Sequence, residues 1–309
     1  MPMETKRLGK TNLQVGRLGI GLSEAGFNLE MSDVDQVRAI INQALDNGVN
    51  FLDTAACYGI SEELLGIVAS DRRDEYVLAT KAGHFLPRGD GEDWTYDLVI
   101  SSIDRSLELM KTDHVDIVQL HSCVIEVLER GDVIRALQDA KAAGKTRFIG
   151  YSGDNDNAKW AVTSGLFDTL QTSFNLVDQS ARTNLFADVE ANDMGLIVKR
   201  PIGNAVWGAD ADPRPYEHIP EYTMEYTRRA GVMGEAGLLE DDPNDRIRLA
   251  LGFTFAHPEV DVTIVGTQRP HHMKSNLEMV SEPLGVTEAT VSDLHARWDK
   301  FAVGWEQRG

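Results

Sequence analysis

Cysteine is scarce in this chain, which has 309 residues and only two cysteines, Cys57 and Cys123. Two cysteines do not provide the disulfide framework of a small secreted domain, so we expect a reducing environment and a cytoplasmic protein. Residues 1–6 also lack the apolar stretch of a signal peptide. Neither cysteine belongs to a recognisable catalytic Cys–His arrangement in the sequence. We interpret both as non-catalytic, with a regulatory thiol as the alternative.

Long apolar runs are also missing. None approaches the roughly 20 residues that a membrane-spanning helix needs, so no membrane partner is expected. Basic residues are outnumbered, with 30 Lys and Arg against 49 Asp and Glu, which gives a formal net charge of −19. This balance disfavours nucleic-acid binding and leaves a small molecule as the expected partner. The acidic stretch at 90–93 lacks calcium-loop spacing, no metal site is expected, and the oligomeric state stays open.

A regular alternation of short apolar strands and amphipathic helices fills most of the chain. The predicted strands lie at residues 17–22, 51–54, 76–81, 115–121, 146–151, 169–173, 195–199 and 260–265. Alternating β and α elements favour a parallel sheet, and eight such units favour the closed (β/α)8 TIM barrel. No G-x-G-x-x-G motif follows the first strand, which weakens the open doubly wound alternative. We predict one domain over 1–309, with an N-terminal β-hairpin at about 5–16 and an additional C-terminal helix at about 287–301.

Three local features of the chain lead to further expectations. Ser32 stands where a capping residue would begin the helix that follows the first strand. One helix is expected near 183–192. The segment at about 201–240, which contains Pro213-Arg214-Pro215, exceeds the usual connection after a strand. It is either a surface excursion or a flap over the barrel mouth.

Polar side chains follow several of the predicted strands, at the ends that meet on one face of a barrel. Asp53, Lys81 and His121 end the second, third and fourth strands, and Tyr58 lies in the loop after Asp53. A tyrosine has a pKa near 10, which a nearby ammonium such as Lys81 lowers. Asp53 can hold that ammonium, and His121 can donate a hydrogen bond to a substrate oxygen. The four residues would polarise and protonate a carbonyl, and the hydride would have to come from a nicotinamide cofactor.

These residues and their neighbours resemble the aldo-keto reductase family over nearly the whole chain. The segments that carry the resemblance are Phe51–Gly59, Ala79–Lys81, Val115–His121, Gly144–Ser152 and Val262–Gly266 with Asn276. The resemblance implies that Tyr58 is the general acid and that the cofactor is NADPH, with NADH possible. It implies that Ser152 and Gln171 hold the nicotinamide carboxamide. The residues implied for the adenosine phosphate end are Gly266, Thr267, Arg269 and Asn276.

The chain departs from the family pattern at several positions. Gly153 stands in place of an asparagine, so Asp154 or Asn155 are candidates to help hold the carboxamide. Lys199 and Arg200 stand where the family has an aromatic residue that stacks on the nicotinamide. The Arg200 guanidinium plane is a candidate to stack there instead, or the two charges are candidates to bind pyrophosphate. A phosphate-binding arginine of the family aligns with His272. Arg269 and Lys274 are candidates to replace it.

The sequence predicts an NAD(P)H-dependent oxidoreductase that reduces an aldehyde or ketone to an alcohol. The first alternative is a cofactor-binding sensor or regulatory subunit with weak or no turnover. The second is a lyase or aldolase that uses Lys81 as a Schiff base. The loops at 84–96 and 201–240 and the tail after about 300 are expected to line the substrate pocket, and the short tail predicts an open one. Candidates to line the pocket are His84, Trp94, Trp207 and Trp305, with core or surface packing as the alternative for each.

Overall fold

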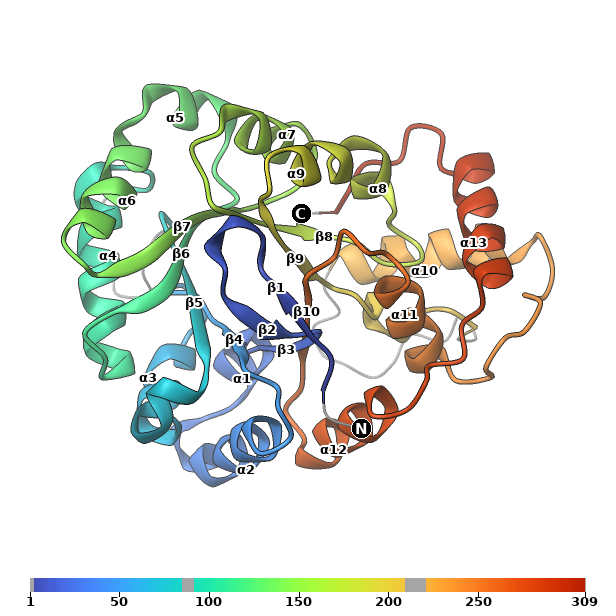
Figure 1. Cartoon of the computed structure of the whole chain (residues 1–309), viewed down its shortest axis with the longest axis horizontal. Helices are drawn as coiled ribbons and strands as arrows, with labels where there is room; N and C mark the ends of the chain where they lie inside the picture. The colour runs from blue at the N-terminus through green and yellow to red at the C-terminus, as the bar shows by residue number, and fades with distance from the viewer. Residues whose placement is uncertain (1–2, 85–91, 209–220, 309) are drawn as a thin grey trace.

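The computed structural model describes residues 3–84, 92–208 and 221–308, and its centre is a closed parallel barrel (Figure 1). The barrel strands are β3 (Leu18–Gly21), β4 (Phe51–Asp53), β5 (Val77–Ala82), β6 (Val115–His121), β7 (Thr146–Ser152), β8 (Thr169–Ser173), β9 (Gly195–Lys199) and β10 (Val262–Gly266). Their order is β10-β3-β4-β5-β6-β7-β8-β9, so each strand pairs with the next along the chain and the last pairs with the first. The predicted eight-stranded TIM barrel is confirmed.

The interior of the barrel changes from apolar to polar along the strands. An apolar cluster fills it near the strand starts, with Phe51, Val77 and Ile117 among its buried members. Side chains alternate between the two faces of a strand, so a residue two positions further on points the same way. Inward-facing apolar residues and the polar residues two positions later form the pairs Phe51–Asp53, Ala79–Lys81 and Ile197–Lys199. Because side chains alternate with a period of two along each strand, these polar groups all point into the barrel at the carboxyl ends of the strands.

The predicted N-terminal hairpin is present, and it closes the other end of the barrel. It consists of β1 (Thr5–Arg7), the 3-10 turn η1 (Gly9–Thr11) and β2 (Gln14–Gly16), and Figure 1 shows it lying across the barrel. Leu8, Leu13 and Val15 extend the apolar cluster of the interior. Gly9 has a φ of +44°, and a Cβ there would lie 2.2 Å from the backbone nitrogen of Gly195, so this close approach requires glycine.

Helices form a ring around the barrel and bury their apolar faces against it (Figure 1). Between β3 and β7 they are α1 (Ser23–Asn28), η2 (Met31–Asp33), α2 (Val34–Leu45), α3 (Ser61–Val68), η3 (Ser70–Glu75), α4 (Tyr96–Met110), α5 (Ile125–Arg130) and α6 (Asp132–Ala142). After β7 they are α7 (Asn155–Ser164), α8 (Ser180–Asn184), α9 (Phe186–Ala191), η4 (Gly203–Ala205), α10 (Glu221–Gly234), α11 (Arg246–Phe255), α12 (Pro270–Val280) and α13 (Glu288–Phe301). The last is the predicted C-terminal helix.

Two local predictions about helix boundaries are wrong. Ser32 does not cap α2, because it lies inside η2, where Glu30 and Asp33 form a reciprocal capping box instead. The single helix expected near 183–192 is two helices, α8 and α9, that meet at Leu185. Leu185 is buried and leaves the helical conformation, so burial of its side chain accompanies the break.

The segment at 201–240 is more regular than its sequence predicts. Residues 221–234 form α10, which packs against α13 and buries Tyr226 and Met233. This part of the expected surface excursion or flap is therefore an ordered helix. Residues 209–220, with the predicted Pro-Arg-Pro stretch, lie outside the described residues.

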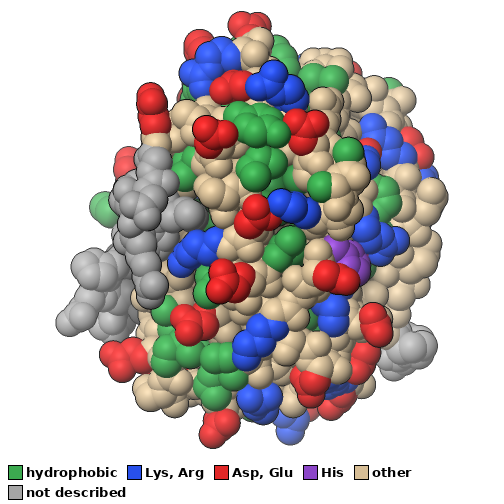
Figure 2. Space-filling model, turned by 90° about the vertical axis from the view of Figure 1, so that its left-hand side faces the viewer, with side chains coloured by type: hydrophobic (Ala, Val, Ile, Leu, Met, Phe, Trp, Pro, Cys, Tyr) green, Lys and Arg blue, Asp and Glu red, His purple; other side chains and the backbone are tan. Residues whose placement is uncertain are grey.

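The described surface mixes both signs of charge. Figure 2 shows one face on which acidic and basic side chains alternate with small apolar patches. The acidic residues therefore do not form one continuous negative patch on this face (Figure 2). Within the described ranges, no helix has both the length and the hydropathy that crossing a bilayer requires.

Candidate active site

A buried ion pair lies at the carboxyl ends of β4 and β5. Lys81 Nζ donates to Asp53 Oδ2 at 2.6 Å and to the backbone oxygen of Thr54 at 2.8 Å. Both charged side chains are closed from solvent. Burial lowers the pKa of Lys81, but the charges of Asp53 and Tyr58 outweigh it, so this pKa is raised. The lysine therefore remains an ammonium at neutral pH.

Tyr58 and His121 lie above this ion pair. The Tyr58 hydroxyl is 3.5 Å from His121 Nε2, and Lys81 Nζ is 4.8 Å from the centre of the tyrosine ring. Gly26 of α1 holds the tyrosine loop in place. A Cβ on Gly26 would lie 2.1 Å from the Tyr58 backbone oxygen, and Ile60 N donates to Gly26 O at 3.3 Å. The predicted tetrad therefore converges at one end of the barrel.

The protonation states of Tyr58 and His121 follow from burial. Burial raises the pKa of Tyr58, and although the Lys81 ammonium lowers it, the pKa remains above its usual value of 10. The expected net lowering of this pKa by Lys81 is thus wrong for the free protein, because desolvation of the phenolate is the larger effect. Burial and the charge of Lys81 hold the pKa of His121 well below 6.5. At neutral pH the site presents a neutral phenol and a neutral imidazole.

Ser152 and Gln171 connect the rim to the ion pair. Ser152 Oγ donates to Gln171 Oε1 at 3.0 Å, and Gln171 Nε2 donates to Asp53 Oδ1 at 2.7 Å. Gln119, which the sequence did not point to, also reaches Asp53 Oδ1, at 3.4 Å. Asp53 is therefore held by three side chains from three other strands, which fixes the position of its carboxylate.

Lys199 pairs with Asp154 on the far side of the mouth. Lys199 Nζ is 2.9 Å from Asp154 Oδ2, and Ser173 N donates to Asp154 Oδ1 at 2.8 Å. Burial alone would raise the pKa of Asp154. The Lys199 charge and the Ser173 N–H have the larger opposite effect, so this pKa lies below its usual value. Asn155, the other candidate for the carboxamide, donates to the backbone oxygen of Gln307 at 3.1 Å. The structure thus gives Asp154 and Asn155 partners within the protein.

Arg200 is also engaged inside the protein. Its guanidinium carbon lies 3.8 Å from the centre of the Tyr222 ring, and its Nη1 donates to the backbone oxygen of Arg308. The guanidinium plane, which was a candidate for stacking on nicotinamide or for binding pyrophosphate, therefore covers a tyrosine of α10.

The C-terminal tail closes this side of the rim. Gln307 is 3% exposed, and its Nε2 donates to Ser173 O at 2.7 Å and to Thr172 Oγ1 at 2.9 Å. Arg229 of α10 donates to the backbone oxygen of Glu306 at 2.5 Å. The short tail is thus buried against the end of β8, while the open substrate pocket expected from its length stays a prediction.

A basic segment follows β10. Thr267 is buried, and its Oγ1 accepts from Arg269 N at 3.1 Å at the start of α12. The side chains of Arg269, His272 and Lys274 are exposed, while Asn276 is 9% exposed. A helix N-terminus beside exposed cations has the chemistry that a phosphate group requires. These residues fit the phosphate end of a dinucleotide.

Aromatic side chains lie next to Tyr58 and His121. The Phe27 ring lies 5.5 Å from the Tyr58 ring, and Phe27 is 62% exposed. The His84 ring lies 4.7 Å from Trp94 and 5.2 Å from His121. His84 and Trp94 therefore lie on the His121 side of the site, and their contact with substrate stays a prediction. The intervening residues 85–91 lie outside the described part of the chain.

Two other aromatic candidates lie differently. Trp305 packs 5.5 Å from Trp298 and beneath Arg229, whose guanidinium carbon is 5.1 Å from its ring centre. Trp207 is partly buried against the main core. Both contribute to packing.

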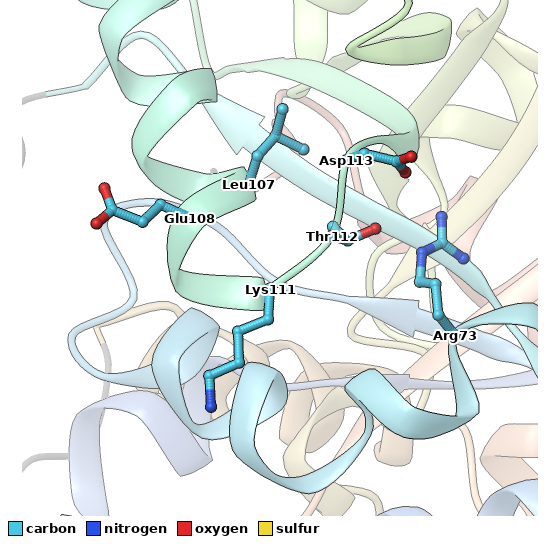
Figure 3. Close-up of a pocket in the computed structure, with 6 residues that line it drawn as sticks. All are labelled: Arg73, Leu107, Glu108, Lys111, Thr112 and Asp113. Carbon is cyan, nitrogen blue, oxygen red and sulfur yellow. The ribbon is translucent and has the colours of Figure 1, made fainter.

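A separate surface hollow lies at the opposite end of the barrel. Figure 3 shows its lining side chains, which come from the end of α4, the following turn and Arg73 of η3. These elements precede the starts of β5 and β6, whereas Lys81 and His121 stand at the other ends of those strands. The hollow is therefore remote from the tetrad. Within the described residues, no group of three or more His, Cys, Asp or Glu side chains is arranged to hold a metal ion.

Comparisons with known proteins agree with this architecture. The profile of the Aldo/keto reductase family matches residues 17–295. L-galactose dehydrogenase of Arabidopsis thaliana is 29% identical over 95% of this chain and 94% of its own. 6-dehydroglucose reductase of Novosphingobium aromaticivorans is 26% identical over 90% of each chain.

A solved structure supports the fold. The holo form of an aldo-keto reductase from Bacillus halodurans superposes with a TM-score of 0.79 at 23% identity, and the match covers 96% of each chain. At this identity the likeness concerns the fold alone. The profile match extends over all the barrel strands, including those that carry Asp53, Lys81 and His121. The chain therefore belongs to the aldo/keto reductase family of oxidoreductases.

Proposed function

We propose that this protein reduces an aldehyde or ketone to an alcohol with NAD(P)H, and that Tyr58 is the general acid. The observation that carries the proposal is the 3.5 Å approach of the Tyr58 hydroxyl and His121 Nε2 above the buried Lys81–Asp53 pair. A phenol and an imidazole N–H placed together can direct two donors at one carbonyl oxygen. The bound nicotinamide supplies the hydride to the carbonyl carbon.

The tetrad divides the proton chemistry among its members. Tyr58 is protonated in the free protein, because burial raises its pKa, and it can therefore donate to the carbonyl oxygen. After donation the phenolate lies beside the Lys81 ammonium, whose charge stabilises it. Asp53 keeps that ammonium in place at 2.6 Å. In the reverse direction the same phenolate would accept the proton of an alcohol.

The proposed cofactor is NADPH. Ser152 and Gln171 would hold the carboxamide, because their hydroxyl and amide groups lie at the strand ends beside Asp53. Gly266, Thr267, Arg269 and Asn276 would hold the adenosine phosphate end, where exposed cations meet the start of α12. For Lys199 and Arg200 we propose a role in shaping the rim, since each is held by a partner within the protein.

A polyhydroxylated carbonyl compound, such as an aldose, is the proposed substrate class. Two relatives bear the names L-galactose dehydrogenase and 6-dehydroglucose reductase. On this chain, the exposed Phe27 ring offers an apolar face next to Tyr58, and His84 with the half-buried Trp94 ring adds a polar and an apolar group on the His121 side. Such a rim suits a ligand with both C–H faces and hydroxyl groups. A panel of aldoses and alkyl aldehydes of equal length tests this, and equal kcat/KM for both groups would argue against it.

Tyr58→Phe tests the proposed reaction. We expect loss of NADPH oxidation with every carbonyl compound, while quenching of tryptophan fluorescence still reports NADPH binding with a Kd close to that of the wild type. Full turnover in this variant would refute the role of Tyr58. Tight cofactor binding by the wild type without turnover of any substrate would instead favour the sensor.

The Schiff-base lyase is the weaker alternative. A lysine attacks a carbonyl as the neutral amine, but the ion pair with Asp53 raises the pKa of Lys81. The ammonium is also directed at Asp53 and at the Thr54 carbonyl. Borohydride treatment with substrate should therefore leave Lys81 unmodified in a mass spectrum.

A further inference from the structure

Cys57 contacts Nδ1 of His121, the histidine of the candidate active site. Its Sγ lies 3.3 Å from His121 Nδ1, and the other ring nitrogen, Nε2, lies 3.5 Å from the Tyr58 hydroxyl. The cysteine and the tyrosine are neighbours in the loop after β4, so one loop holds the imidazole at both nitrogens. Among the described residues, Cys57 is the hydrogen-bond partner of Nδ1.

The neutral imidazole of His121 carries one N–H proton, on either Nδ1 or Nε2. Because burial and the Lys81 charge hold the pKa of His121 well below 6.5, the ring is neutral at physiological pH and carries its N–H on one nitrogen only. If the proton were on Nδ1, Nε2 would accept, and it would compete for the Tyr58 proton. If the proton is on Nε2, both Nε2–H and the Tyr58 O–H are free to donate to one oxygen.

The thiol decides between these two tautomers. Burial raises the pKa of Cys57, so its sulfur remains protonated and can donate. An imidazole nitrogen with a free lone pair accepts readily, whereas a thiol sulfur is a weak acceptor. The S–H to Nδ1 arrangement is therefore favoured over the N–H to sulfur arrangement, and it leaves the ring proton on Nε2.

We propose that Cys57 is a positioning residue, whose thiol donates to His121 Nδ1 and thereby keeps the ring as the Nε2–H tautomer facing the carbonyl-binding position beside Tyr58. This inference deepens the proposed carbonyl reduction and rests on it for its catalytic consequence. The tautomer itself does not depend on turnover. Cys57 does not touch the reacting atoms and acts through His121.

NMR of the free protein tests the tautomer directly. With 15N-labelled histidine, long-range proton–nitrogen correlations distinguish a protonated nitrogen from an unprotonated one, and His121→Gln identifies the signals of that residue among the eight histidines. We expect Nδ1 unprotonated and Nε2 protonated in the wild type. In Cys57→Ala we expect a mixture of tautomers or the Nδ1–H form. Cys57→Ser keeps a donor and should restore the wild-type pattern.

Kinetics with the same variants test the consequence. Loss of one hydrogen bond predicts that Cys57→Ala lowers kcat/KM for reduction about fivefold, chiefly through kcat, with the Kd of NADPH unchanged. Cys57→Ser should recover most of this loss. The matched control is Cys123→Ala, which changes the other cysteine of the chain, whose thiol lies 3.7 Å from the backbone oxygen of Val124, and it should behave as the wild type.

The outcomes separate this inference from the proposed function. An Nδ1–H tautomer in the wild type, or the same tautomer in wild type and Cys57→Ala, would overturn the role of Cys57 whatever the turnover. Retained turnover in Tyr58→Phe together with the expected Cys57-dependent tautomer would instead overturn the role of the tyrosine and leave the thiol–imidazole relation standing.

Discussion

Lys81 Nζ lies 2.6 Å from Asp53 Oδ2 with both side chains closed from solvent. Removal of one partner from a buried pair leaves an uncompensated charge. We therefore expect Lys81→Met to lower the free energy of unfolding by about 3–5 kcal/mol. The double variant Asp53→Asn/Lys81→Met should be more stable than Lys81→Met alone. Urea denaturation checks this, and a double variant that is less stable than both single variants would contradict it.

The rate of carbonyl reduction should depend little on pH across the neutral range. The pKa of Tyr58 is raised above 10 by burial, and that of His121 is held well below 6.5. Both groups therefore keep one protonation state between about pH 7 and 9, and kcat/KM should be flat there. A pH profile at fixed ionic strength tests this. An inflection near pH 6.5 that disappears in His121→Gln would show that the imidazole titrates within the working range.

Acid should weaken the contact between α13 and the turn that follows α11. His257 Nε2 lies 3.0 Å from His295 Nε2, and His257 Nδ1 lies 2.8 Å from the backbone oxygen of Phe253. Burial lowers the pKa of His295 to about 4 and lowers that of His257 below 6.5. The unfolded chain therefore binds more protons than the folded protein between about pH 6.5 and 4, so stability falls as pH falls.

Single variants can isolate this effect. Asp178 opposes it, because burial raises the pKa of that carboxyl to about 6 and favours the folded state in acid. Asp178 is present in both wild type and His295→Gln, so its contribution cancels when the pH dependence of their stabilities is compared. We expect a smaller loss of the urea midpoint between pH 7 and 4.5 in His295→Gln, while His271→Gln, at an exposed position, follows the wild type.

The C-terminal tail should be required for stability at the rim of β8. Gln307→Ala leaves the buried Thr172 hydroxyl and Ser173 carbonyl without the amide donor, so we expect a loss of about 1–3 kcal/mol. Glu306→Ala is the matched control, because the Glu306 side chain is exposed and its backbone oxygen still accepts from Arg229. Thermal unfolding compares the two. An equal change in Tm for both would argue against a specific role for Gln307.

Arg269 should discriminate between the two nicotinamide cofactors. Arg269 is exposed at the start of α12, and in the proposed cofactor site its guanidinium would make a charge-assisted hydrogen bond to the phosphate of NADPH that NADH lacks. Arg269→Ala should raise the Kd of NADPH about tenfold and change that of NADH little. Lys111→Ala, at the hollow of the opposite barrel end, controls for net charge. An equal rise in the Kd of NADPH and of NADH would show that Arg269 contacts a part of the dinucleotide that both cofactors share.

Much of this protein was predictable from the spacing of its residues. Apolar strands separated by amphipathic helices predict the barrel, and a parallel barrel gathers its strand ends on one face. Because Asp53, Lys81 and His121 end their strands, they were expected there together, and the structure brings them together. These predictions depend on local periodicity and on one rule of topology, both of which a sequence contains.

Contacts between distant segments were not predictable in this way. Gln307 reaches Ser173 across more than a hundred residues, and Lys199 has Asp154 as its partner, so an exposed-looking tail and an apparently free cation are both held within the rim. Electrostatics depended on the fold as well. The sequence placed Lys81 near Tyr58 and implied a lowered pKa, but only the packed structure showed that burial has the larger effect. The sequence alone determined the barrel and the identity of its polar end, because these follow from local patterns. The tertiary structure decided partners, burial and protonation, because these depend on which atoms surround each group in three dimensions.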